Sequence, residues 1–430
     1  MKKLAIYASA IIASLTVVSC DDSVEPNVCD TYAVTSTTEG KMISGLICED
    51  FTITNDSEWI LSGGVFVDNG VTLTIEAGTT IKSEKQGANP AFLSILRGGK
   101  IMAEGTATSP IVFTSGEDNP APGDWGGIIV NGRAPINTGA EAQGEGGTGT
   151  YGGDDAEDNS GTIKYVRVEY AGRILGTDNE LNGFSFNGVG SGTTVEYIQA
   201  YEGADDGIEF FGGTVNVKYA VSTHNQDDSF DWTQGWSGKG QFWVVVQGPT
   251  AGDRAIEADN NGDDNAITPF SNPTLSNLTL VGLDDGDASN QGMKLREGTK
   301  GMIYNAIVTG FPKRGVQVEH DQTILNVNAD ELTLNTSIVD NNNPFVYSKS
   351  VDGNGNEIDP SIQLDANKEF EVNGSNQSAT DGSLVTFLNG HVGVEMNGAT
   401  EASSLDAWFT AANYIGAVPS TNDWTANWTK

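Results

Sequence analysis

Seven carboxylates in three short, related runs are the residues of this chain that are best placed to do chemistry. The run 205–209 (DDGIE) returns 22 residues later as 227–231 (DDSFD), and Glu257 has the last acidic place in a third run, 254–258 (RAIEA). Carboxylates at like places of a repeat come close together when the repeats stack. Calcium takes six to eight oxygen ligands, including carboxylates. We therefore expect a calcium site made by Asp205, Asp206, Glu209, Asp227, Asp228, Asp231 and Glu257.

The acidic runs belong to a longer internal repeat, which is typical of a stacked solenoid. In one row, the third places are Tyr165, Tyr197, Tyr219, Asn277 and Asn305. In a second row, the central apolar residues are Phe184, Ile208, Phe230, Ile256, Met293 and Val316. Side chains alternate along a strand, so if these residues point inward, their successors point outward. The predicted outer column is Ser185, Glu209, Asp231, Glu257, Lys294 and Gln317.

The strand pattern begins well before these rows and resembles a known family. The runs 71–82 (VTLTIEAGTTIK), 98–115 (GGKIMAEGTATSPIVFTS) and 125–137 (WGGIIVNGRAPIN) resemble the pectate-lyase-like β-helix lipoproteins of Bacteroidota. The ending 414–430 (YIGAVPSTNDWTANWTK) resembles the C-terminal segment of the same group. The resemblance covers about residues 55–430 and implies an all-β, single-stranded, right-handed parallel β-helix solenoid. It implies no particular activity, because the group is largely uncharacterised.

Four parts of the chain follow from this pattern. Residues 1–19 are expected to be a signal peptide, and residues 20–54 a lipid anchor, linker and N-terminal cap. Residues 55–400 form the predicted β-helix, with an inserted loop of Gly, Ala and acidic residues at about 139–161 that leaves the solenoid between coils. Residues 401–430 form a C-terminal capping segment, in which Leu405–Tyr414 has helical spacing and would cover the last coil.

Three interpretations of the acidic column remain open: a calcium site, an enzyme and a plain solvated acidic face. By resemblance of fold, β-helix lyases bind a uronate through calcium and use a basic residue to take the α-proton. The candidates for that base are Lys294, Arg254, Arg296 and His224. Paired carboxylates would alternatively serve a glycoside hydrolase as acid and base. The GHG and RIK tripeptides of polygalacturonases are absent, and the three histidines lack the spacing of a zinc site.

Aromatic residues beside the acidic runs are candidates for stacking on sugar rings. Trp236 lies in a Gly-Ser loop and is the best of them, and Tyr201 is a second. Trp232 is expected to point inward by alternation, so core packing explains it better.

The N-terminus has the features of a bacterial lipoprotein. Lys2 and Lys3 precede the largely apolar run 4–18, which ends in small residues directly before Cys20. This run is too short for an ordinary spanning helix. The pattern resembles a lipobox, which implies a diacylglycerol on Cys20; the alternative is an ordinary secretory peptide. Acidic residues at 21–22 resemble the surface-export signal of Bacteroidota lipoproteins, which predicts an anchor in the outer membrane, facing the cell surface.

The net charge and the cysteine content restrict the possible partners and disulfides. The formal charge of −36 would repel a phosphate backbone, so nucleic acid is excluded as a partner. With Cys20 acylated, Cys29 and Cys48 are left to form a disulfide in an exported compartment, or to remain free thiols. We expect a non-enzymatic protein that binds a glycan or another extracellular ligand. A polysaccharide lyase or hydrolase, and an accessory or structural subunit of an outer-membrane complex, are the alternatives.

Overall fold

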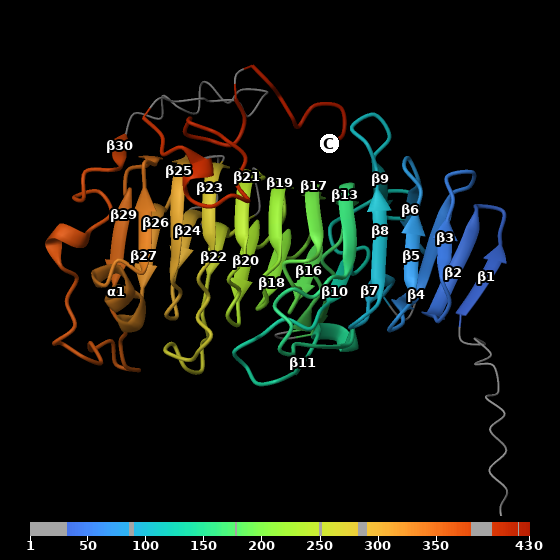
Figure 1. Cartoon of the computed structure of the whole chain (residues 1–430), viewed down its shortest axis with the longest axis horizontal. Helices are drawn as coiled ribbons and strands as arrows, with labels where there is room; N and C mark the ends of the chain where they lie inside the picture. Colours follow the sequence, from blue (N-terminus) through green and yellow to red (C-terminus); the bar gives the residue numbers. More distant parts are fainter. Residues whose placement is uncertain are drawn as a thin grey trace, which may run out of the picture.

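The chain winds into a long parallel solenoid (Figure 1). The computed structural model describes residues 32–85, 90–176, 179–248, 252–282, 290–379, 398–419 and 421–430. Each coil contributes strands to three stacks, and each strand pairs in parallel with those of the neighbouring coils. The predicted parallel β-helix is thereby confirmed.

Stacks 1 and 2 share six long strands, each of which bends near its middle and passes from one stack to the other. They are β13 (Gly161–Glu169), β17 (Thr194–Tyr201), β19 (Asn216–Thr223), β21 (Lys239–Val246), β23 (Thr274–Val281) and β25 (Gly301–Thr309). Stack 1 also contains β3 (Phe51–Ile53), β5 (Thr72–Ile75), β8 (Lys100–Glu104) and β27 (Leu332–Asn335). Stack 2 also contains β6 (Thr80–Ser83), β9 (Ile111–Thr114), β28 (Ile338–Asp340) and β30 (Gln377–Ala379).

Stack 3 carries the acidic runs. Its own strands are β7 (Phe92–Ile95), β10 (Ile128–Asn131), β16 (Phe184–Asn187), β18 (Ile208–Phe211), β20 (Phe230–Thr233), β22 (Arg254–Ala258), β24 (Gln291–Leu295), β26 (Arg314–Glu319) and β29 (Phe345–Ser348). In the first two coils, β2 (Lys41–Ile47) and β4 (Trp59–Val67) run from stack 2 into stack 3. The six apolar residues of the second row point inward and are at most 1% exposed, as predicted.

The first row marks the bend in the long strands. Its residues have left-handed backbone conformations, with φ between 50° and 61°, which non-glycine residues seldom adopt. The structure adds one coil that the row omitted, because β21 places Phe242 between Tyr219 and Asn277. Gly240 replaces the usual aliphatic residue of that coil, since a Cβ there would lie 2.5 Å from Cζ2 of Trp243. The tyrosines stack on one another, with ring centroids 4.2 Å apart for each consecutive pair.

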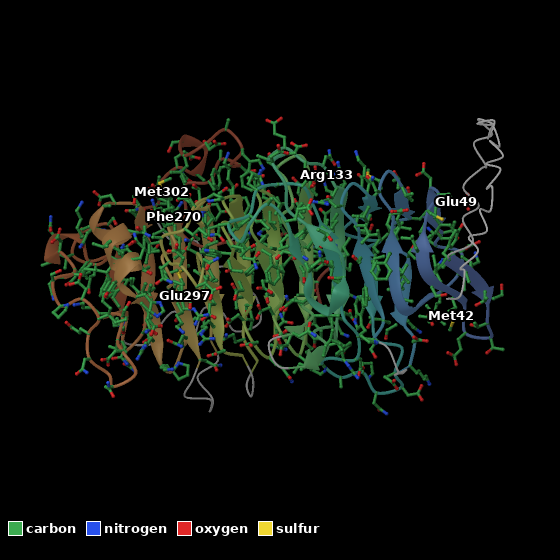
Figure 2. All side chains as sticks on the ribbon, turned by 90° about the horizontal axis from the view of Figure 1, so that it is seen from below. Met42, Glu49, Arg133, Phe270, Glu297 and Met302 are labelled. Atoms are coloured by element: carbon green, nitrogen blue, oxygen red, sulfur yellow. The ribbon has the colours of Figure 1, made fainter. Side chains whose placement is uncertain are left out.

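The solenoid starts earlier than expected. β2 and β3 already pair in parallel with β4 and β5, so the first coil begins at Lys41 and not at residue 55. Before it, β1 (Tyr32–Ser36) pairs antiparallel with β2 and occupies the N-terminal edge. Figure 2 shows Met42 and Glu49 at this end and Glu297 and Met302 far along the long axis. In the described ranges, no helix is long and apolar enough to cross a membrane.

The C-terminal segment lies along the side of the solenoid and does not cover its last coil, contrary to our expectation (Figure 1). Leu405–Tyr414 forms no helix, and the one regular element among the described residues of the segment is the short 3-10 helix η4 (Ala402–Ser404). Side-chain amides of the coils bind its backbone instead: Gln241 exchanges two hydrogen bonds with Thr410, and Gln199 exchanges two with Lys430. These bonds compete with the intrahelical bonds that a helix would need.

Beyond β26 the chain forms the α-helix α1 (Asp321–Asn328) and, after β29, the 3-10 helix η2 (Ala366–Lys368).

The insertion at 139–161 folds back over stack 3 and does not extend away from the solenoid, contrary to our expectation. It contains β11 (Ala142–Gln143), η1 (Glu145–Gly147) and β12 (Thr150–Tyr151). The Thr148 carbonyl accepts hydrogen bonds from Ser94 and Asn131, and the Tyr151 hydroxyl donates to Gln234. The hairpin of β14 (Ile174–Gly176) and β15 (Asn179–Glu180) supports it, because Asn179 accepts a hydrogen bond from Gly146 N.

Candidate metal centre

The outer column of stack 3 provides the central residues of the site. Strand pairing places its six residues in direct register, in the predicted order Ser185, Glu209, Asp231, Glu257, Lys294 and Gln317. Neighbouring parallel strands lie about 4.8 Å apart, so successive residues of the column are direct neighbours.

The turn before each strand supplies further carboxylates. Asp206 Oδ1 accepts a hydrogen bond from the backbone N–H of Asp228 at 2.9 Å, and Asp228 Oδ1 accepts one from that of Arg254 at 2.7 Å. Both carboxylates are buried, at 7% and 3% exposure. Each of these two aspartates therefore uses one oxygen to hold the following coil, and the other remains for an ionic contact.

The carboxylates form four overlapping groups of three, and within each group the ligand oxygens lie within 4.8 Å of one another. Two ligands of one calcium ion are at most about 5 Å apart, twice the length of a calcium–oxygen bond. The groups are Asp205, Asp206 and Asp227; Asp206, Glu209 and Asp231; Asp227, Asp228 and Asp253; and Asp228, Asp231 and Glu257. We call these eight residues the acidic ribbon. The structure thus brings all seven expected ligands together.

The eighth member, Asp253, was missed from the sequence although a signal was present. Asp253 directly precedes Arg254, as Asp205 precedes Asp206 and Asp227 precedes Asp228. Glu145 and Glu180, two further acids near the ribbon, gave no such signal, because the insertion and the β14–β15 hairpin bring them there. Burial, and then the charge of Glu180, raise the pKa of Glu145 to about 7.

Burial dominates the electrostatics of the ribbon. It raises the pKa values of Asp206, Glu209, Asp228 and Asp231 well above those of free carboxyl groups, and the neighbouring carboxylates raise them further. The pKa of Asp205 rises to about 8, through burial first and then the charge of Asp227. Buried like charges at this spacing are costly unless a cation or protons neutralise them.

The donor chemistry fits a hard divalent cation. All donors are carboxylate oxygens, which calcium prefers. The buried Oδ1 of Asp231 accepts no hydrogen bond from any described residue, although Asp231 belongs to two of the four groups. A buried acceptor without a partner is costly, and a bound cation would satisfy it. Asp206, Glu209 and Asp231 would hold such an ion, with Asp205 and Asp227 beside them.

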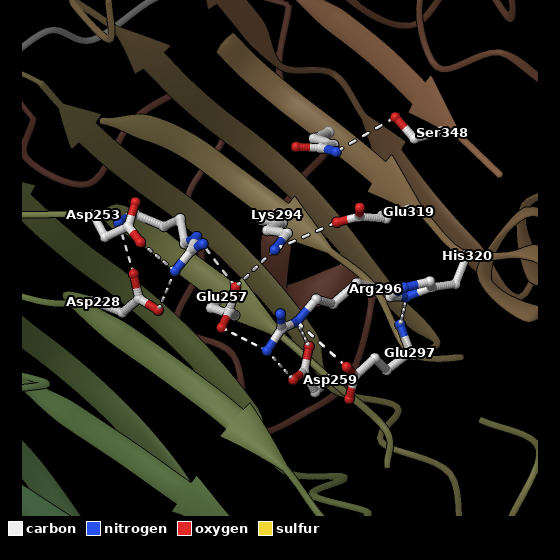
Figure 3. Close-up of polar contacts among 12 residues, drawn as sticks. Asp228, Asp253, Glu257, Asp259, Lys294, Arg296, Glu297, Glu319, His320 and Ser348 are labelled. Atoms are coloured by element: carbon white, nitrogen blue, oxygen red, sulfur yellow. Dashed lines mark hydrogen bonds and ion pairs between the residues drawn. The ribbon is translucent and has the colours of Figure 1, made fainter. Parts of the chain in front are cut away.

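The other end of the ribbon is neutralised by the protein's own cations (Figure 3). Arg296 makes a bidentate pair with Asp259, at 2.7 and 2.9 Å, and its Nη2 lies 2.8 Å from Glu257 Oε2. Lys294 Nζ lies 3.6 Å from Glu257 and 3.4 Å from Glu319. Burial raises the pKa of Asp259 to about 6, although the pair with Arg296 opposes this shift.

The candidate bases divide into two places. Lys294, Arg254 and Arg296 lie together at the paired end of the ribbon. His224 does not join them: its side chain lies 4.0 Å from Glu202 and beside the ring of Tyr201.

The sugar-stacking role of Trp236 is wrong, because this residue is fully buried. Its ring stacks on Phe210 with centroids 4.1 Å apart, and its indole N–H donates to the Val215 carbonyl. The Gly-Ser loop that indicated exposure turns the indole into the core. Tyr201 is partly exposed, but its hydroxyl donates to Glu202 and its ring lies under Lys430, so the C-terminal segment contacts it.

The predictions for the N-terminus fall mostly outside the described residues. Cys20 and Cys29 lie outside them, whereas Cys48 is described and forms a disulfide. The pairing of Cys29 with Cys48 and the lipidation of Cys20 stay predictions.

Comparison with known proteins identifies the family. Residues 45–429 match the model of the pectate-lyase like beta helix domain, so the chain belongs to this family. No curated protein and no solved structure matches the chain.

Proposed function

We propose that this member of the pectate-lyase-like β-helix family is a calcium-dependent binding protein for an anionic extracellular glycan. One observation carries the proposal: among the described residues, Asp205, Asp206, Glu209, Asp227 and Asp231 have no Lys or Arg within ion-pair distance, although they lie close together. A calcium ion bound there would retain coordination positions for the carboxylates of a ligand. The paired cations alongside would attract the same ligand.

We further propose that the protein is held at the outer membrane by a lipid on Cys20, facing the cell surface. The support is the basic start, the apolar run 4–18 and the acidic residues that follow Cys20. That orientation would place the protein on the same side of the membrane as an extracellular glycan. Labelling with a radioactive fatty acid, lost in Cys20→Ser, tests the anchor.

Calcium binding is tested by the melting temperature in calcium and in chelator. We expect calcium to raise the melting temperature of the wild type, because binding to the folded state alone stabilises it. Glu209→Gln should abolish that rise. Asp154→Asn, which changes an exposed acid of the insertion, is the matched control and should keep it. An equal melting temperature in calcium and chelator for the wild type would remove the proposal.

A uronate lyase is the second candidate, favoured by the position of Lys294. This residue follows Glu257 in the same outer column, one coil from the ribbon, and its side chain is only 12% exposed. The wild type should be incubated with a panel of uronate-containing polysaccharides in calcium. If a polysaccharide retards the protein in native electrophoresis and no new products form, the result supports binding alone. An unsaturated product, absent with Lys294→Met, would establish the lyase instead.

A further inference from the structure

Arg254 occupies one half of the acidic ribbon. Its Nη1 lies 2.5 Å from Asp253 and 3.6 Å from Asp228, and its Nε lies 3.2 Å from Glu257. Burial opposes the charge of the guanidinium, but the three carboxylates raise its pKa above the ordinary value. Lys294 and Arg296 also contact Glu257, but among the described residues Arg254 alone of the three contacts Asp228 and Asp253 as well. It is therefore the central positive charge of this half, and it is a part of the protein rather than a ligand.

The four carboxylate groups differ in whether they contain this charge. Arg254 contacts members of two of them, Asp227–Asp228–Asp253 and Asp228–Asp231–Glu257. The other two, which contain Asp206, have no basic side chain within ion-pair distance in the described part of the chain. Two adjacent cation positions thus have similar carboxylates, but Arg254 neutralises one of them and no basic side chain of the described residues neutralises the other.

A second observation shows that Arg254 fills its position imperfectly. Glu257 is 6% exposed, yet its Oε1 accepts no hydrogen bond, and the Nε of Arg254 donates none. The guanidinium, at 3.2 Å, and the Lys294 ammonium, at 3.6 Å, neutralise this buried oxygen without a hydrogen bond, whereas a smaller cation could coordinate it directly. Figure 3 shows Glu257 beside Lys294 and Arg296.

We infer that Arg254 is a built-in counter-ion that takes the place of a second divalent cation. The acidic ribbon then binds one calcium ion, at Asp206, Glu209 and Asp231, and Arg254 sets this stoichiometry. The inference rests on the proposed calcium site and adds the number of ions and the residue that limits it. Removal of the guanidinium should open the second position.

Isothermal titration with calcium chloride alone, on the purified full chain, tests the inference. The wild type should bind one ion and Arg254→Met two, whereas Arg254→Lys, which keeps the charge, should bind one. Arg314→Met is the matched control, because Arg314 lies in register two strands further along, bonds to Gln317 and belongs to no carboxylate group. It should bind one ion.

The outcomes separate the two proposals. No ion on the wild type overturns the calcium site itself. One ion on both the wild type and a folded Arg254→Met, or two ions on the wild type, overturns the role of Arg254 alone. A further pair of variants covers misfolding of Arg254→Met: Asp253→Asn should keep the affinity of the single site, and Glu209→Gln should lose it. Equal loss in both variants overturns the role of Arg254.

Discussion

The two ends of the acidic ribbon are built on different strands of the same stack and in the same columns, yet their buried charges are neutralised differently. At the Glu257 end, Arg254, Lys294 and Arg296 lie between the carboxylates. At the Glu209 end, the nearest groups are other carboxylates, together with the amide of Asn182, which donates to Glu209. The paired end has its counter-ions within the chain, whereas the unpaired end needs a cation or protons from outside it.

The residues of one acidic column therefore differ in function. Buried ion pairs hold the structure only while both partners are present. Buried like charges, in contrast, cost stability until a cation or protons arrive. Substitutions at the two ends should therefore have opposite signs, which the following three experiments examine.

The largest effect is expected for Arg296→Met at the paired end. It removes the bidentate partner of Asp259 and a contact of Glu257, both of which are buried. Loss of one member of a buried pair costs about 3–5 kcal/mol in the free energy of unfolding. Denaturant unfolding should show this loss in calcium and in chelator alike. Arg133→Met, which changes an exposed arginine, is the control. If both variants lower the free energy of unfolding equally little, the paired end of the ribbon does not stabilise the fold as we describe.

A smaller effect of opposite sign is expected for Asp231→Asn at the unpaired end. Because the folded-state pKa of Asp231 is raised, its ionisation destabilises the fold as pH rises above about 4, the value of the unfolded chain. In chelator at pH 8, the variant should be more stable than the wild type by roughly 1–3 kcal/mol. Near pH 4 the difference should vanish. Denaturant midpoints at the two pH values check this, and a less stable variant at pH 8 would refute it.

The smallest effect is expected for Glu145→Gln in the insertion. The folded-state pKa of about 7 lies above the unfolded value of 4.5, so the wild type loses stability between these two pH values. In chelator, Glu145→Gln should remove this loss and stabilise the protein at pH 8. The shift corresponds to about 3 kcal/mol at most, of which solvent screening at the surface insertion should leave on the order of 1 kcal/mol. At pH 4 no change is expected. Glu141→Gln, in the same insertion but exposed, is the control for the pH titration of the melting temperature.

The columns of the solenoid could be predicted because they follow from local alternation and a repeat of nearly constant length. The sequence rows place Glu209, Asp231 and Glu257 in the order that the strand register confirms. Contacts made by insertions carry no such period, which is why the approach of Glu145 was missed.

Two predictions from the sequence were wrong for one physical reason: residues that are distant in the sequence form contacts that local patterns do not reveal. Trp236 looked exposed in its loop, but the Val215 carbonyl and the Phe210 ring hold it inside. The segment 405–414 has helical spacing, but the coils offer it amide side chains from residues that are more than a hundred positions away. Local patterns describe neither kind of contact.

The C-terminal segment changes how the solenoid should melt. A repeat protein joins each coil only to its neighbours, so its ends can fray without disturbing the middle. Here the segment bonds to residues of six successive long strands, from Arg167 in β13 to Asn305 in β25. Fraying of any of these coils must also break bonds to a segment that spans the others. The segment thus couples distant coils, and the central six should unfold in one cooperative step.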